Sequence, residues 1–187
     1  MLKAFGAFLQ DYQHYRPAAA IDKAHVSLIF STAISQKPES ILELGIGTGL
    51  VTYALKHATI YNLKGQITSV DSWVDWDGIE PPEIDNLRKN NINVIFSEEE
   101  KFVANCKDKY DLIVVDGDHT NGHKWAESIF DLLNPGGIMF SHDINLFPNL
   151  KVYKEIADKR GYAYHLFDKS SRSDERCDRG FIIVYAK

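Results

Sequence analysis

The stretch Ile41-Leu42-Glu43-Leu44-Gly45-Ile46-Gly47-Thr48-Gly49-Leu50 decides how this chain folds. Its apolar first half predicts a buried strand, and a helical pattern begins at about Leu50, directly after three glycines at alternate positions. Glycines in such a turn allow positive φ angles and a close approach of the backbone to a ligand. The N-terminus of the following helix directs N–H groups and its positive dipole end at the same place. The stretch therefore predicts a strand, a ligand-binding turn and a helix.

An acid at the end of the next expected strand strengthens this interpretation. Residues 66–70 predict a strand, and Asp71 ends it 22 positions after Gly49. A carboxylate at that position can accept hydrogen bonds from both hydroxyls of a ribose. The glycine spacing is G-x-G-x-G rather than the G-x-G-x-x-G of dinucleotide-binding folds, which disfavours a nicotinamide-dependent dehydrogenase. The pattern is typical of a nucleoside-binding half of a doubly wound sheet.

The rest of the chain continues the alternation of strands and helices. Further strands are expected over 93–96, 111–116, 138–141, 162–167 and 180–185, and helices over 1–15, 18–35, 83–90, 98–107, 123–133 and 150–160. Asn134-Pro135-Gly136-Gly137 is expected to end one helix and turn into the following strand. The last two strands follow each other without a helix, so we expect them to pair antiparallel at one edge of the sheet. The expected architecture is a three-layer α/β fold with right-handed crossovers.

Composition limits the class of protein. The chain has 187 residues, of which 44% are hydrophobic and 25% charged, which is typical of one globular domain. A net charge of −5 argues against a nucleic-acid partner. We expect no signal peptide, and no apolar run comes near the ~20 residues that cross a bilayer. The distant Cys106 and Cys177 are expected to be free thiols. We expect a cytoplasmic protein without a membrane partner; whether it forms a homo-oligomer stays open.

Four motifs resemble, in order and spacing, the class I S-adenosylmethionine-dependent methyltransferases. They are ILELGIGTGL, the acid in SVDSW, the strand DLIVVDGDH, and LNPGGIMFSHD. The last two also resemble small-molecule O-methyltransferases, both the catechol and caffeoyl-CoA type and the sugar O-methyltransferase and cephalosporin-hydroxylase-like group. The resemblance implies a Rossmann-like seven-stranded sheet, mostly parallel with an antiparallel edge hairpin. It implies one domain over 1–187, with N-terminal helices over 1–37 on the substrate side and the core over 38–187.

The resemblance also implies S-adenosylmethionine as cofactor and a set of residues that bind it. The cofactor carboxylate suits the backbone amides of 45–49, its ribose suits Asp71, and its ammonium suits Glu43 or Asp116. The expected cofactor-binding residues are Glu43, Gly45, Gly47, Gly49, Asp71, Ser72, Trp73, Ser97, Glu98 and Asp116. Trp73 is expected to stack on adenine, to close over the substrate or to pack the loop. Glu98 is expected either to contact adenine or to be a surface acid.

A second group of residues points to the chemistry. Asp116 ends one central strand and His142-Asp143 end the neighbouring one, so these side chains are expected at one rim of the sheet. Carboxylate and imidazole groups suit a divalent cation such as Mg²⁺ or Mn²⁺. Metal-dependent relatives usually carry two acids, or an acid and an asparagine, where this chain has His142-Asp143. The resemblance therefore leaves a metal requirement open.

His119 is the expected general base, with Asp116 beside it as the second catalytic residue. It follows Asp116 by three residues, where the catechol-type relatives carry a lysine base. Neutral imidazole can take a proton from a hydroxyl of a small-molecule acceptor. Alternatively, His119 orders its loop by contacting Asp118 or Asp143. For the whole chain, the alternative is a regulatory or assembly protein that binds the cofactor without methyl transfer.

Substrate selection is left to few segments. They are the N-terminal aromatic helices, the loop over 73–82 and the polar stretch over 168–179, which we expect to be solvated. Four histidines belong to no recognisable constellation of side chains and are expected to be structural: His14, His25, His57 and His165.

Overall fold

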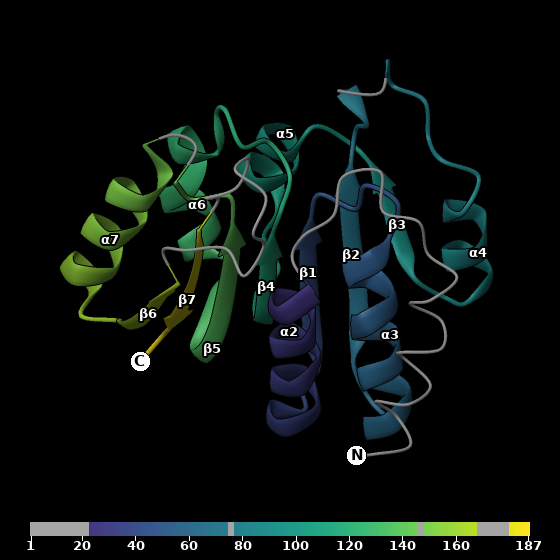
Figure 1. Cartoon of the computed structure of the whole chain (residues 1–187), viewed down its shortest axis with the longest axis horizontal. Coiled ribbons are helices and arrows are strands. Elements are labelled where there is room, and N and C mark those ends of the chain that lie inside the picture. The colour runs from purple at the N-terminus through teal and green to yellow at the C-terminus, as the bar shows by residue number, and fades with distance from the viewer. Residues whose placement is uncertain (1–22, 75–76, 146–147, 168–179) are drawn as a thin grey trace.

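Strands and helices alternate along the chain in the computed structural model, which describes residues 23–74, 77–145, 148–167 and 180–187 (Figure 1). The strands are β1 (Ser40–Leu44), β2 (Gln66–Asp71), β3 (Asn93–Phe96), β4 (Tyr110–Val115), β5 (Leu133–His142), β6 (Ala163–Phe167) and β7 (Phe181–Tyr185). The helices are α2 (Lys23–Gln36), α3 (Leu50–Asn62), α4 (Ile84–Lys89), α5 (Glu99–Asn105), the 3₁₀ helix η2 (Gly122–Trp125), α6 (Ala126–Asp131) and α7 (Asn149–Arg160). The helix expected over 1–15 and the stretch 168–179 lie outside the described residues.

The strands form one seven-stranded sheet in the order β3-β2-β1-β4-β5-β7-β6. The pairs among β1 to β5 are parallel, and β7 runs antiparallel to both of its neighbours. This confirms the mostly parallel sheet and the antiparallel pair at its edge. The strand order reverses between β1 and β4, and ligands of open α/β sheets bind at the carboxyl ends of the strands at such a point.

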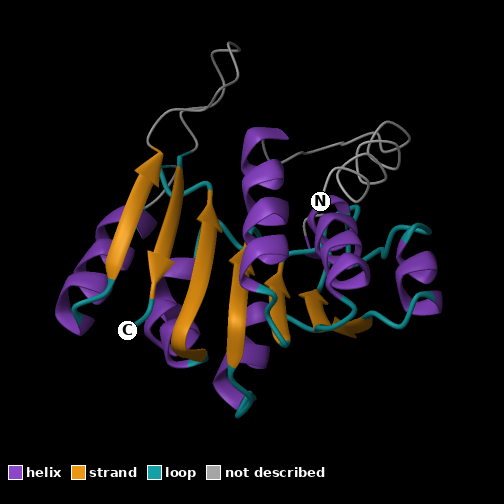
Figure 2. Cartoon of the chain, turned by 90° about the horizontal axis from the view of Figure 1, so that it is seen from below, coloured by secondary structure: helices purple, strands orange, loops and turns teal. Residues whose placement is uncertain are grey.

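Alternate residues of each strand face opposite helix layers. Ile41, Leu112 and Val114 pack with α2, α3 and α4. Leu42 and Ile113 pack on the other face with α5, α6 and α7. Figure 2 shows the strands side by side with helices on both sides. The three-layer expectation is confirmed, and near-continuous apolar strands are what a sheet covered on both faces requires.

The expected helix over 123–133 and the turn after it are wrong in detail. The segment is a 3₁₀ turn followed by α6, which ends at Asp131. Leu132 already accepts a hydrogen bond from the Tyr110 amide at 2.8 Å, so the chain pairs with β4 before it reaches Asn134. Gly136 has φ 75° inside β5, and the register with β4 shifts there. The Pro-Gly-Gly stretch therefore forms an irregularity within a strand instead of a turn between elements.

The structure tests the expectations on the cysteines and on membrane-spanning segments only for the residues that it describes. Cys106 is a free thiol, while Cys177 lies outside the described residues. Among the helices of the described ranges, none is long and apolar enough to cross a membrane.

Candidate functional site

The glycine turn joins β1 to α3 at the point where the strand order reverses. Gly45, Gly47 and Gly49 have φ angles of 89°, 53° and 90°. A Cβ on Gly45 would fall onto the backbone of Asp116 and Gly117, so only glycine lets the end of β1 lie against the end of β4. At Gly47 nothing lies within 4 Å of the position that a Cβ would take. The turn thus combines one tightly packed glycine with one that borders open space.

Asp71 holds the turn from the end of β2. Its Oδ2 accepts hydrogen bonds from the backbone amides of Ile46 at 2.8 Å and Gly47 at 2.9 Å. The amide of Gly45 donates to a β2 carbonyl, and that of Gly49 to a carbonyl within the turn. These amides, which were expected to receive a ligand carboxylate, have acceptors inside the protein. The Asp71 carboxylate is the anion that the turn holds in this structure.

Trp73 packs against the same turn. Its side chain is buried, its backbone takes φ 47°, and its amide donates to Asp71 Oδ1 at 2.6 Å. The indole Nε1 donates to the carbonyl of Gly47 at 3.0 Å, and the ring lies 5.8 Å from that of Phe96. Ser72 is half-buried between these two residues. Of the three expected roles of Trp73, the structure displays loop packing; a contact with adenine stays a prediction.

Glu43 links β1 to α3 and β2 within the core. Its side chain is fully buried, and its Oε2 accepts hydrogen bonds from the hydroxyls of Thr52 at 2.7 Å and Ser69 at 2.6 Å. Burial raises the pKa of Glu43 to about 8, and the nearby charges of Asp116 and Asp71 raise it further. The two hydrogen bonds act in the opposite direction and lower it. A carboxyl that is neutral at pH 7 is a poor partner for a ligand ammonium. A contact between Asp116 and the ammonium stays a prediction.

The acids after β3 divide between the surface and the core. Ser97 is half-buried, and its amide donates to the carbonyl of Asp71 at 3.0 Å. Glu98 is exposed and forms an ion pair with Lys101 at 2.9 Å. Of the two expected roles of Glu98, the structure displays the surface acid; a contact with adenine stays a prediction.

Glu99 is the residue that the sequence reasoning missed. It is only 8% exposed, and its Oε1 accepts a hydrogen bond from the amide of Asp118 at 3.0 Å. Burial raises its pKa to about 8, although the Asp118 amide works against the shift. The signal was in the helical period, because Glu99 and Val103 stand four residues apart on the buried face of α5.

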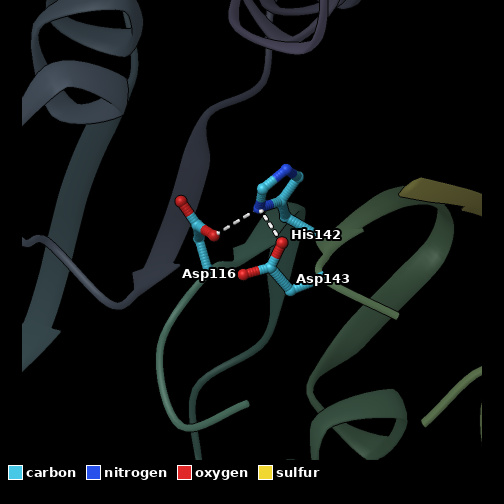
Figure 3. Close-up of side chains that lie close together, drawn as sticks. All are labelled: Asp116, His142 and Asp143. Atoms are coloured by element: carbon cyan, nitrogen blue, oxygen red, sulfur yellow. Dashed lines mark hydrogen bonds and ion pairs between the residues drawn. The ribbon is translucent and has the colours of Figure 1, made fainter. Parts of the chain in front are cut away.

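Asp116, His142 and Asp143 come together at the carboxyl ends of β4 and β5 (Figure 3). His142 Nδ1 lies 2.9 Å from Asp116 Oδ1 and 3.1 Å from Asp143 Oδ1. One potential ligand atom from each residue lies within 4.8 Å of the others. The arrangement is the one that adjacent parallel strands predicted, and its donor set is two carboxylates and one imidazole.

His119 joins this cluster through Asp143. Its Nε2 lies 3.2 Å from Asp143 Oδ2, while its carbonyl accepts from the Asn149 side chain at 3.1 Å. The His119 side chain is 31% exposed and the Asp143 side chain is not exposed. Asp118, the other expected partner, instead accepts from the amides of Thr120 and Asn121. Asp143 therefore contacts both histidines, one with each oxygen.

α2 closes one side of the cluster with a histidine that was expected to be structural. The His25 ring is stacked on Phe181 at 4.3 Å and meets the His142 ring edge-on at 5.4 Å. His25 is buried, so it packs the aromatic wall behind His142.

Comparison with known proteins finds a matching family model and a curated relative. A family model described as a methyltransferase domain matches residues 42–144. A polyamine aminopropyltransferase from Korarchaeum cryptofilum is 25% identical over 148 residues, covering 71% of this chain and 44% of that protein. The chain thus spans less than half the length of this curated relative.

Solved structures share the fold at low sequence identity. An S-adenosylhomocysteine-bound methyltransferase from Podospora anserina has a TM-score of 0.69 at 18% identity, covering 98% of this chain and 88% of its own. An O-methyltransferase from Bacillus cereus in complex with S-adenosylhomocysteine has 0.64 at 16%, covering 99% and 91%. An O-methyltransferase from Streptomyces achromogenes in complex with S-adenosylmethionine has 0.68 at 12%, covering 98% and 89%.

The buried Glu43 carboxyl makes stability depend on pH. Its pKa rises from an ordinary 4.5 to about 8 on folding, so between these values the folded state binds the extra proton. The free energy of unfolding therefore falls as pH rises through this window, by up to about 1.4 kcal/mol per pH unit for this group. Urea unfolding is measured at several values from pH 5 to 8, and the free energy of unfolding of Glu43→Gln is expected to fall less steeply with pH than that of wild type. The exposed Glu100→Gln should keep the wild-type pH dependence. An equal pH dependence in both variants would contradict the assignment.

Proposed function

This chain belongs to the methyltransferase domain family, and we propose that it transfers the methyl group of S-adenosylmethionine to a hydroxyl of a small molecule. The observation that carries the choice of oxygen chemistry is the contact between His119 Nε2 and the buried Asp143 carboxylate, beside Asp116 at the strand ends. The names of the structural neighbours, which include O-methyltransferases bound to S-adenosylhomocysteine or S-adenosylmethionine, support the same reading.

The open space and the acids around the turn support a site for the cofactor there. Open space borders Gly47, and the acids Asp71 and Asp116 stand at the ends of β2 and β4. A carboxylate offers about four acceptor sites, and three amides occupy Asp71, so a ribose hydroxyl can still be received there. When bound, the cofactor supplies a methyl carbon activated by a positively charged sulfur. The acidic surroundings complement that charge and the ammonium of the same molecule.

His119 supplies the base in this proposal. A neutral imidazole can contact the Asp143 carboxylate only by donating the Nε2 proton, which leaves the lone pair on Nδ1. Nδ1 then accepts the proton of the acceptor hydroxyl, and Asp143 stabilises the imidazolium that results. The protein's remaining task is to align the oxygen and to exclude water, because the transfer is an in-line displacement.

The cluster of Asp116, His142 and Asp143 also fits a divalent cation. His142 Nδ1 faces both carboxylates, yet its single proton can be donated fully to only one of them. A cation in place of that proton would satisfy both carboxylates and the nitrogen together. Held there, Mg²⁺ or Mn²⁺ would favour the ionised form of an acceptor hydroxyl.

One further donor deserves a test because of the aminopropyltransferase relative. An aminopropyl group, which the name of that relative gives as the group transferred, carries no carboxylate. The observation that favours it here is that the amides of Gly45, Ile46, Gly47 and Gly49 already have acceptors, so none of them is left for a carboxylate. The binding experiment below separates the two donors.

Titration calorimetry tests the cofactor. S-Adenosylhomocysteine is expected to bind, and Asp71→Ala is expected to weaken it at least about tenfold, since a lost charged hydrogen bond costs roughly 1.5–3 kcal/mol. Asp85→Ala, on the exposed face of α4, is the matched control and should bind like wild type. Tighter binding of the decarboxylated analogue would favour aminopropyl transfer, and saturable NAD binding would overturn the interpretation of the turn.

Substitution of His119 tests the base. With an acceptor identified from a panel of catechols, phenols and sugars, His119→Ala is expected to lower kcat by about 10²- to 10⁴-fold. S-Adenosylhomocysteine affinity should stay unchanged, and the residual rate should rise with pH as the acceptor ionises unaided. His165→Ala, on the edge strand β6, should leave kcat as in wild type. An unchanged kcat in His119→Ala would remove this residue from the mechanism, and binding without transfer to any acceptor would favour the regulatory alternative.

Mn²⁺ binding tests the cation site. Electron paramagnetic resonance is expected to show Mn²⁺ bound by wild type and at least about tenfold weaker binding in His142→Ala, since ligand loss removes one of the donors. Excess EDTA should abolish turnover and added Mg²⁺ or Mn²⁺ should restore it. Full activity in EDTA, with no bound Mn²⁺ signal, would make the three residues a hydrogen-bonding support.

A further inference from the structure

Glu99 reaches the loop that carries the reactive residues from outside the cluster. It is the first residue of α5, and its carboxyl is buried beneath the loop over 116–119. Its preceding neighbour Glu98 points to solvent, so the chain turns one acid of the pair inward. Burying a carboxyl is costly unless it gains something at the site.

The Glu99 carboxyl makes two contacts with the loop. Oε1 accepts the hydrogen bond of the Asp118 amide at 3.0 Å. The same oxygen occupies the space that a Cβ on Gly117 would take. Gly117 does not have a positive φ, so its backbone conformation alone would admit alanine. Glycine at this position is therefore explained by the Glu99 carboxyl rather than by the backbone.

The loop that Glu99 holds runs directly from Asp116 to His119. Within this loop, the Asp118 carboxylate accepts hydrogen bonds from the backbone amides of Thr120 and Asn121. The Asn149 side chain binds the carbonyl of His119. Glu99 binds the loop between these two ends, at a point that lies between Asp116, which faces His142, and His119, which faces Asp143.

We propose that Glu99 is a positioning residue whose carboxyl, packed on Gly117 and bonded to the Asp118 amide, sets the path of the loop that brings His119 to Asp143. The role of His119 as base rests on the proposed function, whereas the positioning itself does not. The charged groups that face Glu99 are Asp71, Asp116 and Asp118, and burial beside them raises its pKa to about 8. A neutral Glu99 carboxyl avoids repulsion from these three acids. Glutamine, which is also neutral and has nearly the same shape, is therefore a close mimic of it.

The tautomer of His119 is the direct readout. In long-range ¹H–¹⁵N spectra of the ligand-free protein in EDTA, with the imidazole neutral, wild type is expected to show the Nε2–H tautomer. Glu99→Ala should convert that signal into a mixture with the Nδ1–H form, because the loop is released. Glu99→Gln should restore the wild-type signal, since its carbonyl can accept from the Asp118 amide. Glu100→Gln on the exposed face is the matched control, and loss of the signal in His119→Ala gives the assignment.

A double-mutant cycle tests the contact itself. Gly117→Ala is expected to lower the folding equilibrium constant about tenfold or more in the wild-type background, the size of an overpacking penalty. In the Glu99→Ala background the same change should cost less than about threefold, because the space is then free. Equal costs in both backgrounds, or an unaltered His119 tautomer in Glu99→Ala, would overturn the proposal. Neither readout uses a donor or an acceptor, so a failure here is distinct from a failure of the proposed methyl transfer.

Discussion

The approach of β1 to β4 at Gly45 is the constraint on which the rest of the site depends. Because no side chain fits between Gly45 and the backbone of Asp116 and Gly117, the ends of the two central strands meet directly. That contact places the glycine turn next to the Asp116 loop, at the reversal of strand order. Asp71 binds amides of the turn and Glu99 binds an amide of the loop, so both segments are held by carboxyls from outside the two strands.

Several acids lie at this site, and they differ in burial and in hydrogen-bond partners. Glu43 and Glu99 are buried deeply enough for burial to raise the pKa of each to about 8, so they act as neutral supports at pH 7. Asp71 instead accepts hydrogen bonds from backbone amides of the glycine turn. The distinction explains how one rim can hold several carboxyls, because those that serve only as supports need not carry charge.

The sequence could predict whatever depends on local pattern. The strand borders at Gln66–Asp71, the start of α3 at Leu50 and the meeting of Asp116 with His142 follow from apolar runs, glycines and strand adjacency. The Pro-Gly-Gly stretch was misjudged because pairing with β4 overrides a local turn signal. Glu99 was missed because an acid beside another acid looks like surface, and only the position of Gly117 reveals what it touches. The internal acceptors of the turn amides likewise come from tertiary contacts with Asp71.

Asp143 links the two chemical proposals, because its two oxygens serve different histidines. Oδ1 faces His142 and Oδ2 faces His119. In the proposed mechanism the Asp143 carboxylate holds His119, and a cation bound at the same carboxylate would compete with that contact. A bound cation would also favour ionisation of the acceptor hydroxyl and so reduce the need for a strong base. The two routes to an oxygen nucleophile thus draw on one buried carboxylate.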